Sequence, residues 1–152
     1  MLPNWVDTLA AYERWVVNEL HDLGADVEPE PLVGYDVPIF YSGGYEYSGL
    51  AVPRHLVRFH HGMEFEFDFT VYFSHHAPPP LDFEYGTYSY GLREADGTWI
   101  WRHDKHDEPH HGFRLASHQH VGPSEIPEEE HDVDIGDVVR HLRETLKERD
   151  LL

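Results

Sequence analysis

The stretch Met63-Glu-Phe-Glu-Phe-Asp-Phe-Thr-Val-Tyr-Phe73 alternates apolar and polar side chains with a period of two. Successive side chains of a β-strand point to opposite faces, so the phenylalanines share one face and the acidic residues the other. The stretch is therefore predicted to be a half-buried strand of an antiparallel sheet, with its phenylalanine face in the core.

The segments on either side predict more antiparallel strands. Residues 55–61 are expected to pair with the strand at 63–73 through a tight turn at His61-Gly62. A weaker hairpin is expected from 35–41 and 44–50, and another from 83–93 and 98–103 around Ala95-Asp96-Gly97. Together these segments predict one sheet of about four to six strands.

Apolar residues three and four positions apart predict a helix at each end of the chain. The N-terminal stripe comprises Trp5, Leu9, Tyr12, Val16, Leu20 and Leu23, and Gly24 is expected to end it. The C-terminal stripe comprises Ile135, Val138, Val139, Leu142 and Leu146, with Asp132 or Asp134 as its cap. The N-terminal stripe is compatible with packing on the sheet and with formation of a homodimer, and both alternatives stay open.

The fold is therefore predicted to be α+β, with one antiparallel sheet and both helices over its phenylalanine face. We expect a single domain over residues 1–152. Its parts are an N-terminal helix and connector (1–34), antiparallel strands (35–103), a histidine-rich loop (104–131) and a C-terminal helix (132–152).

The composition is strongly acidic. The 152 residues include 29 Asp and Glu against 11 Lys and Arg, a net charge of −18, and only Lys105 and Lys147 are lysines. Such a surface repels itself at low ionic strength, whereas at 1 M salt the screening length falls to about 3 Å. The composition favours a halophilic, haloarchaeal protein; the alternative is an acidic protein of a low-salt cell with a basic partner.

Several classes of protein do not fit this sequence. The chain has no cysteine, so disulfides and thiolate zinc sites are excluded. No apolar run approaches the roughly 18 residues of a membrane span. The first residues lack the basic region of a secretory signal. We therefore expect a cytoplasmic protein that does not enter a membrane.

Six of the fourteen histidines lie in one segment, from Arg102 to His120. They are His103, His106, His110, His111, His118 and His120. Residues 93–120 carry four basic and five acidic side chains, a net of −1, and the other residues carry −17. This nearly neutral, imidazole-rich segment is where an anionic substrate is expected to bind.

One interpretation is cleavage of RNA by histidine acid–base chemistry without a metal ion. Imidazoles transfer protons near neutral pH, and a guanidinium stabilises charge on a phosphoryl group. In an extended segment His118 and His120 point to the same side, so they are expected to be the acid and the base. Asp104 would orient an imidazole and Arg102 would bind phosphate; Arg114, Lys105 and His106 are candidate substrate-binding residues.

Two other interpretations stay open. Clustered imidazoles and carboxylates also bind zinc, nickel or non-haem iron, and all six histidines of the segment are candidate ligands. No spaced ligand motif such as H-E-x-x-H supports that interpretation. A non-catalytic module would instead bind a protein through outward-facing aromatic residues, for which the candidates are Tyr85, Tyr88, Tyr90, Trp99 and Trp101.

The motifs from residue 88 onward follow one another in a recognisable order. Tyr88 and Tyr90 precede the turn Asp96-Gly97 and a strand that ends in Arg102-His-Asp104. His118-Gln-His120-Val-Gly122, Pro127-Glu128-Glu129 and the closing helix follow. This order resembles the TumE-like toxins of bacterial and archaeal toxin–antitoxin operons, over roughly residues 63 to 148.

The chain departs from that family at two positions. Lys105 stands where the family usually has Asn, and Ser117 stands where members often have an additional His. The resemblance implies a toxin that is neutralised by a small helix-turn-helix antitoxin. Cleavage of RNA is a further inference from the residues and not from the resemblance.

Overall fold

The computed structural model describes residues 9–26, 35–42, 45–74, 83–105 and 117–152. For residues 9, 35–42, 45, 73–74 and 83–85 it describes the backbone alone. The predictions made for Trp5, His106, His110, His111 and Arg114, and for the side chain of Tyr85, lie outside the described residues.

The described residues form two helices and eight strands. In chain order these are α1 (Leu9–Asp22), β1 (Ala25–Asp26), β2 (Tyr35–Ser42), β3 (Tyr45–Phe59), β4 (Glu64–Ser74), β5 (Phe83–Arg93), β6 (Trp99–Lys105), β7 (Ser117–Val121), β8 (Glu128–Glu129) and α2 (Ile135–Glu148). The strands make one antiparallel sheet in the order β1-β3-β4-β5-β6-β7-β8, with β2 also paired to β3. The predicted α+β class is confirmed. Six strands have five residues or more, and the sequence did not predict the two-residue strands β1 and β8.

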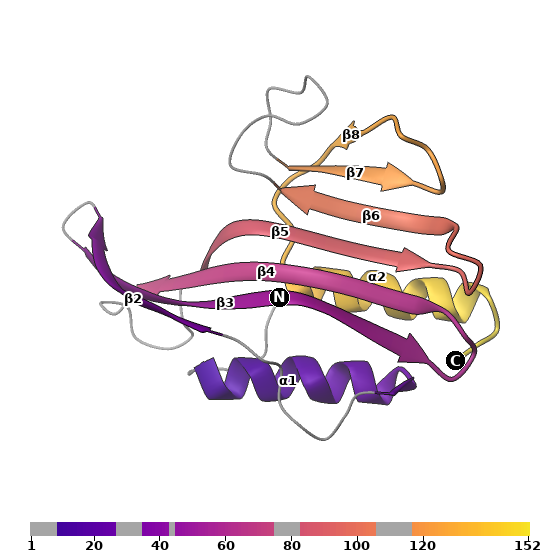
Figure 1. The fold of residues 1–152 in the computed structure, drawn as a ribbon, viewed down its shortest axis with the longest axis horizontal. Coiled ribbons are helices and arrows are strands. Elements are labelled where there is room, and N and C mark those ends of the chain that lie inside the picture. The colour runs from indigo at the N-terminus through magenta and orange to yellow at the C-terminus, as the bar shows by residue number, and fades with distance from the viewer. Residues whose placement is uncertain (1–8, 27–34, 43–44, 75–82, 106–116) are drawn as a thin grey trace.

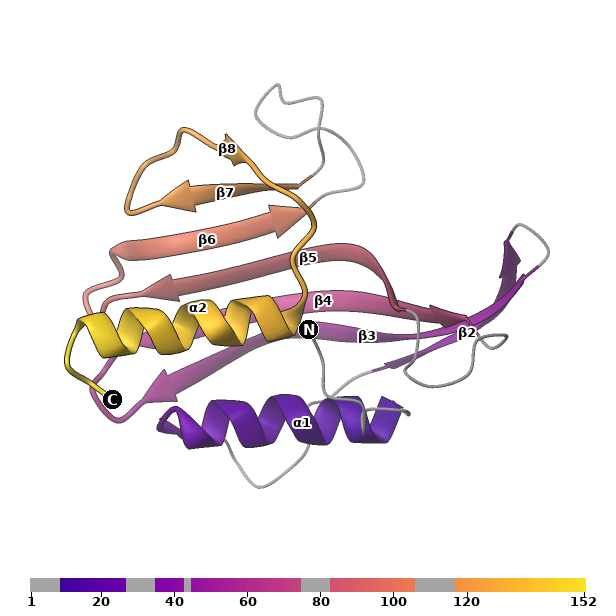
Figure 2. The ribbon, with the colours of Figure 1, turned by 180° about the vertical axis from the view of Figure 1, so that it is seen from behind.

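Both helices contribute to one core on the phenylalanine side of the sheet. Figure 2 shows α2 lying across this side, which we call the helix face, with α1 beside it near β3. Figure 1 shows the opposite side, where no described helix lies; we call it the open face. Arg143 of α2 donates a 3.2 Å hydrogen bond to Glu19 of α1, which ties the two helices together.

The core confirms the predicted alternation of β4. Phe65, Phe67, Phe69 and Val71 are buried with the apolar stripes of both helices in one cluster. Edge-to-face packing joins Tyr12 of α1 to Phe69, with ring centroids 5.8 Å apart. The polar residues of β4 lie on the open face, where Arg93 forms ion pairs with Glu64 and Glu66.

The β3 strand differs from the prediction because it is continuous. The sequence indicated separate strands at 44–50 and 55–61, whereas the structure has one strand of 15 residues. Its pairing with β4 shifts between Val52 and His55, and Pro53 lies at that shift. A proline has no N–H to donate, and a bulge lets a strand continue past it. The predicted turn at Gly62 is confirmed, with φ +92°.

The predicted loop over 104–131 is wrong in part, because it contains strands. Residues 104–105 belong to β6, and Ser117–Val121 form β7, which pairs with β6 over five residues. The Ser, His and Gln side chains of β7 are not among the residue types that favour strands. Pairing with the unpaired backbone groups of β6 outweighs that preference, as tertiary context commonly does.

The start of α2 confirms one of the two predicted caps. The Asp137 amide donates to Asp134 Oδ1 at 2.7 Å, and the Asp134 amide donates to Asp137 Oδ2 at 3.1 Å. This reciprocal pair satisfies backbone N–H groups that have no partner within the helix. Among the described residues, no helix has the length and apolar character that crossing a bilayer requires.

Replacing Phe67 tests which face of β4 supports the fold. Phe67 is 0% exposed, so Phe67→Ala is expected to lower the free energy of unfolding by about 3–5 kcal/mol. The matched control is Leu56→Ala on β3, where a side chain 46% exposed on the open face should cost less than about 1 kcal/mol. Urea unfolding in concentrated KCl measures both, and equal losses would contradict the assignment of the two faces.

Candidate functional site

Strand β6 sends neighbouring side chains to opposite faces of the sheet. Trp101 and His103 point to the helix face, where both contact α2. Arg102 and Asp104 point to the open face, where Asp104 accepts a hydrogen bond from Ser89 of β5. Residues of the histidine-rich segment therefore belong to two separate clusters, one on each face of the sheet.

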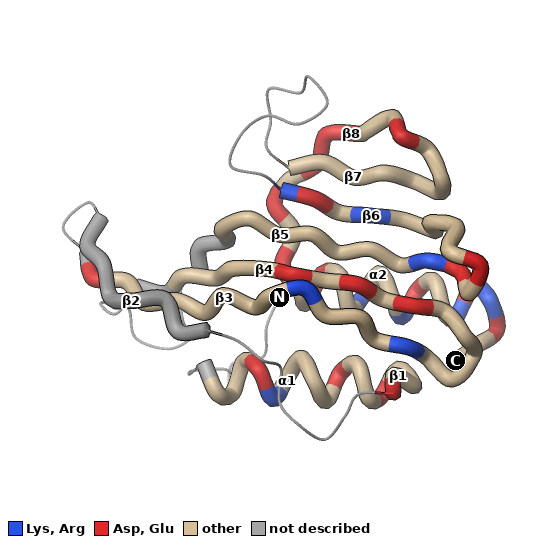
Figure 3. The backbone as a smooth tube through the Cα atoms, viewed as in Figure 1, with Lys and Arg blue, Asp and Glu red and all other residues tan. Residues whose placement is uncertain are grey.

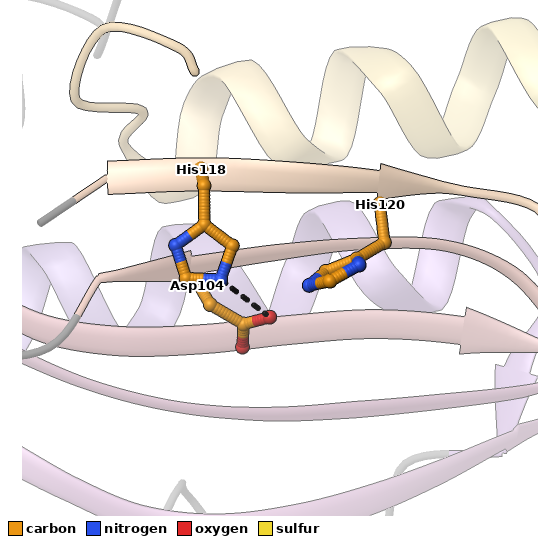
Figure 4. Close-up of side chains that lie close together, drawn as sticks. All are labelled: Asp104, His118 and His120. Atoms are coloured by element: carbon orange, nitrogen blue, oxygen red, sulfur yellow. Dashed lines mark ion pairs between the residues drawn. The ribbon is translucent and has the colours of Figure 1, made fainter. Parts of the chain in front are cut away.

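The open-face cluster consists of Asp104, His118 and His120, and we call it the Asp–His–His cluster. Antiparallel pairing sets Asp104 opposite His118 and Arg102 opposite His120. One potential ligand atom from each of the three residues lies within 4.8 Å of the other two. The separation between His118 Nε2 and Asp104 Oδ2 is 3.9 Å (Figure 4). The prediction that His118 and His120 share one side is confirmed by their positions on β7.

All three residues of the cluster are buried. His118 and His120 are 0% exposed and Asp104 is 8% exposed. Ser89 Oγ donates to Asp104 Oδ1 at 2.7 Å, which leaves Oδ2 directed toward His118. His120 Nδ1 lies 3.1 Å from the carbonyl oxygen of Ser124, so that nitrogen carries the proton and donates it. In the neutral ring the lone pair is then on Nε2.

Arg102 lies beside this cluster in a polar and aromatic setting. Its guanidinium is 5.3 Å from the centre of the Trp99 ring, and Nη2 is 3.6 Å from a carboxylate oxygen of Glu125. The Trp99 ring lies against Gly91, where a Cβ atom would come within 2.5 Å of it. Among the described residues, Arg102 Nε has no hydrogen-bond partner. Because this nitrogen is buried, an anion can use it as a donor after a local rearrangement.

The arrangement allows two kinds of chemistry. Two imidazoles and a carboxylate can transfer protons, and they can also bind a divalent metal ion. As candidate metal ligands, the sequence offered the six histidines of the segment. The structure instead gathers two of those histidines with Asp104, while His103 lies on the other face.

The helix-face cluster consists of Glu130, His103 and His141. His103 Nδ1 donates to the Glu130 carboxylate, at 2.9 and 3.0 Å from its two oxygens. The other His103 nitrogen is 2.9 Å from His141 Nδ1 on α2. The His141 ring stacks on Trp101 with centroids 4.3 Å apart. This cluster connects β6, the segment after β8 and α2.

His141 is held in its neutral form. Burial, followed by the effect of His103, lowers the pKa of His141 from 6.5 to about 4, although Glu144 opposes the shift. His103 and His141 line a pocket of about 200 Å³ beside α2, together with Val133, Asp137, Val138, Arg140 and Glu144. Neutral His141 Nδ1–H can then donate to His103 Nε2, while His103 donates from Nδ1 to Glu130.

Lys105 is not brought to the Asp–His–His cluster, although the sequence made it a candidate substrate-binding residue. It lies on the helix face, where its Nζ is 2.6 Å from Asp132 Oδ2. Burial works to raise the pKa of Asp132, but hydrogen bonds from Lys105 and Ser117 outweigh it and lower that pKa. The alternation of side chains along β6 is the reason, because Lys105 is one position from Asp104.

The aromatic residues of 85–101 give little support to a protein-binding surface. Tyr88, Tyr90 and Trp101 are buried in the core, so these three of the five candidates do not face outward. Burial raises the pKa of Tyr88 to about 12, and its hydroxyl accepts a hydrogen bond from the Val133 amide. Trp99 is partly exposed and lies between Arg93 and Arg102.

Sequence reasoning missed Ser89, Glu130 and His141. Ser89 carries no pattern of its own and is identified by its register with Asp104. Glu130 stood in an acidic run that looked like a solvated loop. His141 follows the buried position Val138 by three residues, so helical periodicity could have placed it at the edge of the apolar stripe.

Acidification should weaken the fold through His141. Because its folded-state pKa is lowered from 6.5 to about 4, the unfolded chain binds this proton more readily; the stabilisation is complete above pH 6.5 and is lost as the pH falls toward 4. The full shift corresponds to ~3 kcal/mol, reduced to ~1–2 kcal/mol because the ring is partly exposed.

The variant His141→Gln should lack this part of the pH dependence. Urea unfolding between pH 4 and 7 in 2 M KCl measures it, and the exposed His60→Gln is the matched control. A slope of stability against pH that is the same in His141→Gln as in the wild type would contradict a neutral, partly buried His141.

Similarity to known proteins does not add to this geometry. No family model, curated protein or solved structure matches the chain. The functional interpretation therefore depends on the two clusters and on the resemblance of the motif order. Of the two clusters, the Asp–His–His cluster contains the residues that the sequence predicted to be catalytic.

Proposed function

We propose that the protein is the toxin of a toxin–antitoxin pair and that it cleaves RNA at Arg102, Asp104, His118 and His120. The observation that carries this proposal is the pairing of β6 with β7. It sets Arg102 opposite His120 and Asp104 opposite His118, on the open face of the sheet. Four residues chosen for one phosphate site are thus immediate neighbours across two strands.

The motifs of the resemblance fall on one continuous part of the fold. Tyr88 and Tyr90 lie on β5, Arg102 and Asp104 on β6, and His118 and His120 on β7. These strands are adjacent in the sheet. Figure 2 shows α2 along β4 and β5, and its side chains reach Trp101 and His103 of β6. This supports a single unit with the functional residues on one side. In this proposal a small helix-turn-helix antitoxin is the partner.

Arg102 supplies the anion-binding part of the proposed site. Its Nε has no hydrogen-bond partner among the described residues, and the Glu125 carboxylate lies 3.6 Å from Nη2. A guanidinium with unused donors suits a phosphodiester, whose charge it can bind through two N–H groups. Glu125 is 75% exposed along its side chain, so an incoming phosphate can displace it.

The burial of both imidazoles sets a condition on catalysis. His118 and His120 are 0% exposed, so RNA reaches them after a local rearrangement. Residues 123–127 contact the site through Ser124, next to His120 Nδ1, and through Glu125, next to Arg102. Each contact is a single interaction of a surface segment. In this proposal, opening of 123–127 precedes cleavage.

The charge of the protein affects where RNA can bind. A net charge of −18 repels a polyanion at low ionic strength. Figure 3 shows basic residues along β3, β5 and β6 beside the acidic residues of β4. On the open face, Arg54 pairs with Glu66, and Arg93 pairs with Glu64 and Glu66. We propose that the protein works in concentrated salt, as expected for a halophile, where the repulsion is screened.

Expression of the protein tests the proposal. Wild type is expected to stop growth and degrade RNA, whereas His118→Asn/His120→Asn should permit growth and reduce cleavage by purified protein at least about 10²-fold. Arg102→Gln should also restore growth, because it removes the phosphate-binding cation. His60→Asn/His131→Asn is the matched control, since both of these histidines are exposed and lie outside the site.

The readouts separate loss of function from loss of fold. Circular dichroism and urea unfolding in KCl show whether each variant is folded. Normal growth and intact RNA with folded wild type would contradict the proposed function, and so would toxicity that is unchanged in folded His118→Asn/His120→Asn.

A further inference from the structure

We propose that Asp104, His118 and His120 bind one divalent transition-metal ion of the zinc type. This inference concerns the same cluster as the proposed function and names its cofactor, but metal binding itself does not require RNA as the substrate. Its first support is proximity, since one nitrogen or oxygen from each residue lies within 4.8 Å of the other two. Ligand atoms around tetrahedral zinc are ~3.4 Å apart, given Zn–N distances of about 2.1 Å.

The separation of His118 from Asp104 fits an ion better than a hydrogen bond. His118 Nε2 and Asp104 Oδ2 are 3.9 Å apart, whereas a charge-assisted hydrogen bond would hold them at about 2.8 Å. A zinc ion shared by the two atoms needs a separation nearer ~3.4 Å, which small rotations of the side chains achieve. Figure 4 shows these two groups facing each other, with the His120 ring alongside.

The second, independent support is the orientation of the ligands by their neighbours. His120 Nδ1 donates to the Ser124 carbonyl oxygen at 3.1 Å, which leaves the Nε2 lone pair for a ligand bond. Ser89 Oγ donates to Asp104 Oδ1 at 2.7 Å, which leaves Oδ2. Metal-binding histidines and carboxylates are commonly held in this way, with one atom hydrogen-bonded to the protein and the other on the ion.

The backbone adds a third argument, which is rigidity. Asp104 and His118 are directly paired on β6 and β7, and His120 follows His118 by two residues on the same strand. Ligands on paired strands keep their spacing better than ligands on a loop. A bound cation would also offset the cost of burying the Asp104 carboxylate, which is 8% exposed.

The donor set defines the class of ion. Two nitrogens and one carboxylate oxygen suit Zn²⁺, Ni²⁺, Mn²⁺ or Fe²⁺, and three protein ligands leave a position for water. Bound water becomes more acidic, so such an ion could activate water next to Arg102. The imidazoles would then act as ligands and not as the acid and the base that the sequence predicted.

Direct binding measurements test the site. The full chain, stripped with a chelator and kept in concentrated KCl, is titrated with ZnCl₂, NiCl₂ or MnCl₂ by calorimetry. We expect one equivalent of Zn²⁺ to bind, and the thermal midpoint to rise by about 5–10 °C when free Zn²⁺ is about a hundredfold above Kd. With Co²⁺ as the probe, visible absorption reports the coordination geometry.

Variants locate the ion. Asp104→Asn and His120→Gln should weaken binding more than a hundredfold, and Ser89→Ala about tenfold, because Ser89 orients a ligand without touching the ion. The control His106→Ala/His110→Ala/His111→Ala removes the alternative histidine ligands and should keep one equivalent. Loss of binding in that control, or unchanged binding in folded Asp104→Asn, would overturn the proposal. If a ligand variant does not fold, the Co²⁺ spectrum of the Ser89→Ala protein provides the test in its place.

The same protein separates this inference from the proposed function. Wild type that binds one ion at the cluster but leaves RNA intact would contradict RNA cleavage and not the metal site. RNA cleavage by wild type that binds no ion would contradict the metal site and not RNA cleavage.

Discussion

The antiparallel pairing of β6 with β7 is the interaction on which the candidate site depends. Its register decides which side chains meet, because a shift by one residue would send His118 and His120 to the helix face. With the observed register, Asp104 faces His118 and Arg102 faces His120. The pairing is anchored at its far end by the Gly122 amide, which donates to the Ile100 carbonyl oxygen at 2.8 Å. Backbone hydrogen bonds therefore position a cluster whose members come from both sides of an eleven-residue gap, 106–116, in the described chain.

Periodicity allowed much of the fold to be predicted, and its limits explain the rest. The alternation of 63–73 identified β4 and its buried face because the apolar side chains there are large and regularly spaced. Asp134 was a recognisable cap because short acidic side chains accept from free helix N–H groups. The β7 strand has no such pattern, since Ser117-His-Gln-His is polar on both faces. Strand pairing formed it, and that pairing is a long-range property which local sequence does not contain.

Periodicity also placed part of the candidate site. His118 and His120 could be placed on one side by their spacing of two, and Asp104 and Arg102 by theirs. What sequence could not provide was the separation of Lys105 from Asp104, because the residues from 104 onward had been interpreted as a loop. Once β6 extends to Lys105, alternation assigns His103 and Lys105 to the helix face. Glu130 and His141 then become their neighbours, although both are far from them in sequence.

The two clusters differ in the distances between their polar atoms. On the helix face, His103 and His141 are 2.9 Å apart, and His103 Nδ1 is 2.9 Å from Glu130. These are hydrogen-bond distances, too short for an ion between the two nitrogens, so the cluster is complete by itself. On the open face, His118 Nε2 and Asp104 Oδ2 are 3.9 Å apart while Ser89 and Ser124 hold the other atoms of Asp104 and His120. A hydrogen-bonded network that joins α2 to the sheet and a wider set of oriented ligand atoms thus occupy opposite faces of one strand. This difference in spacing, and not the number of histidines, is the reason to propose metal binding on the open face.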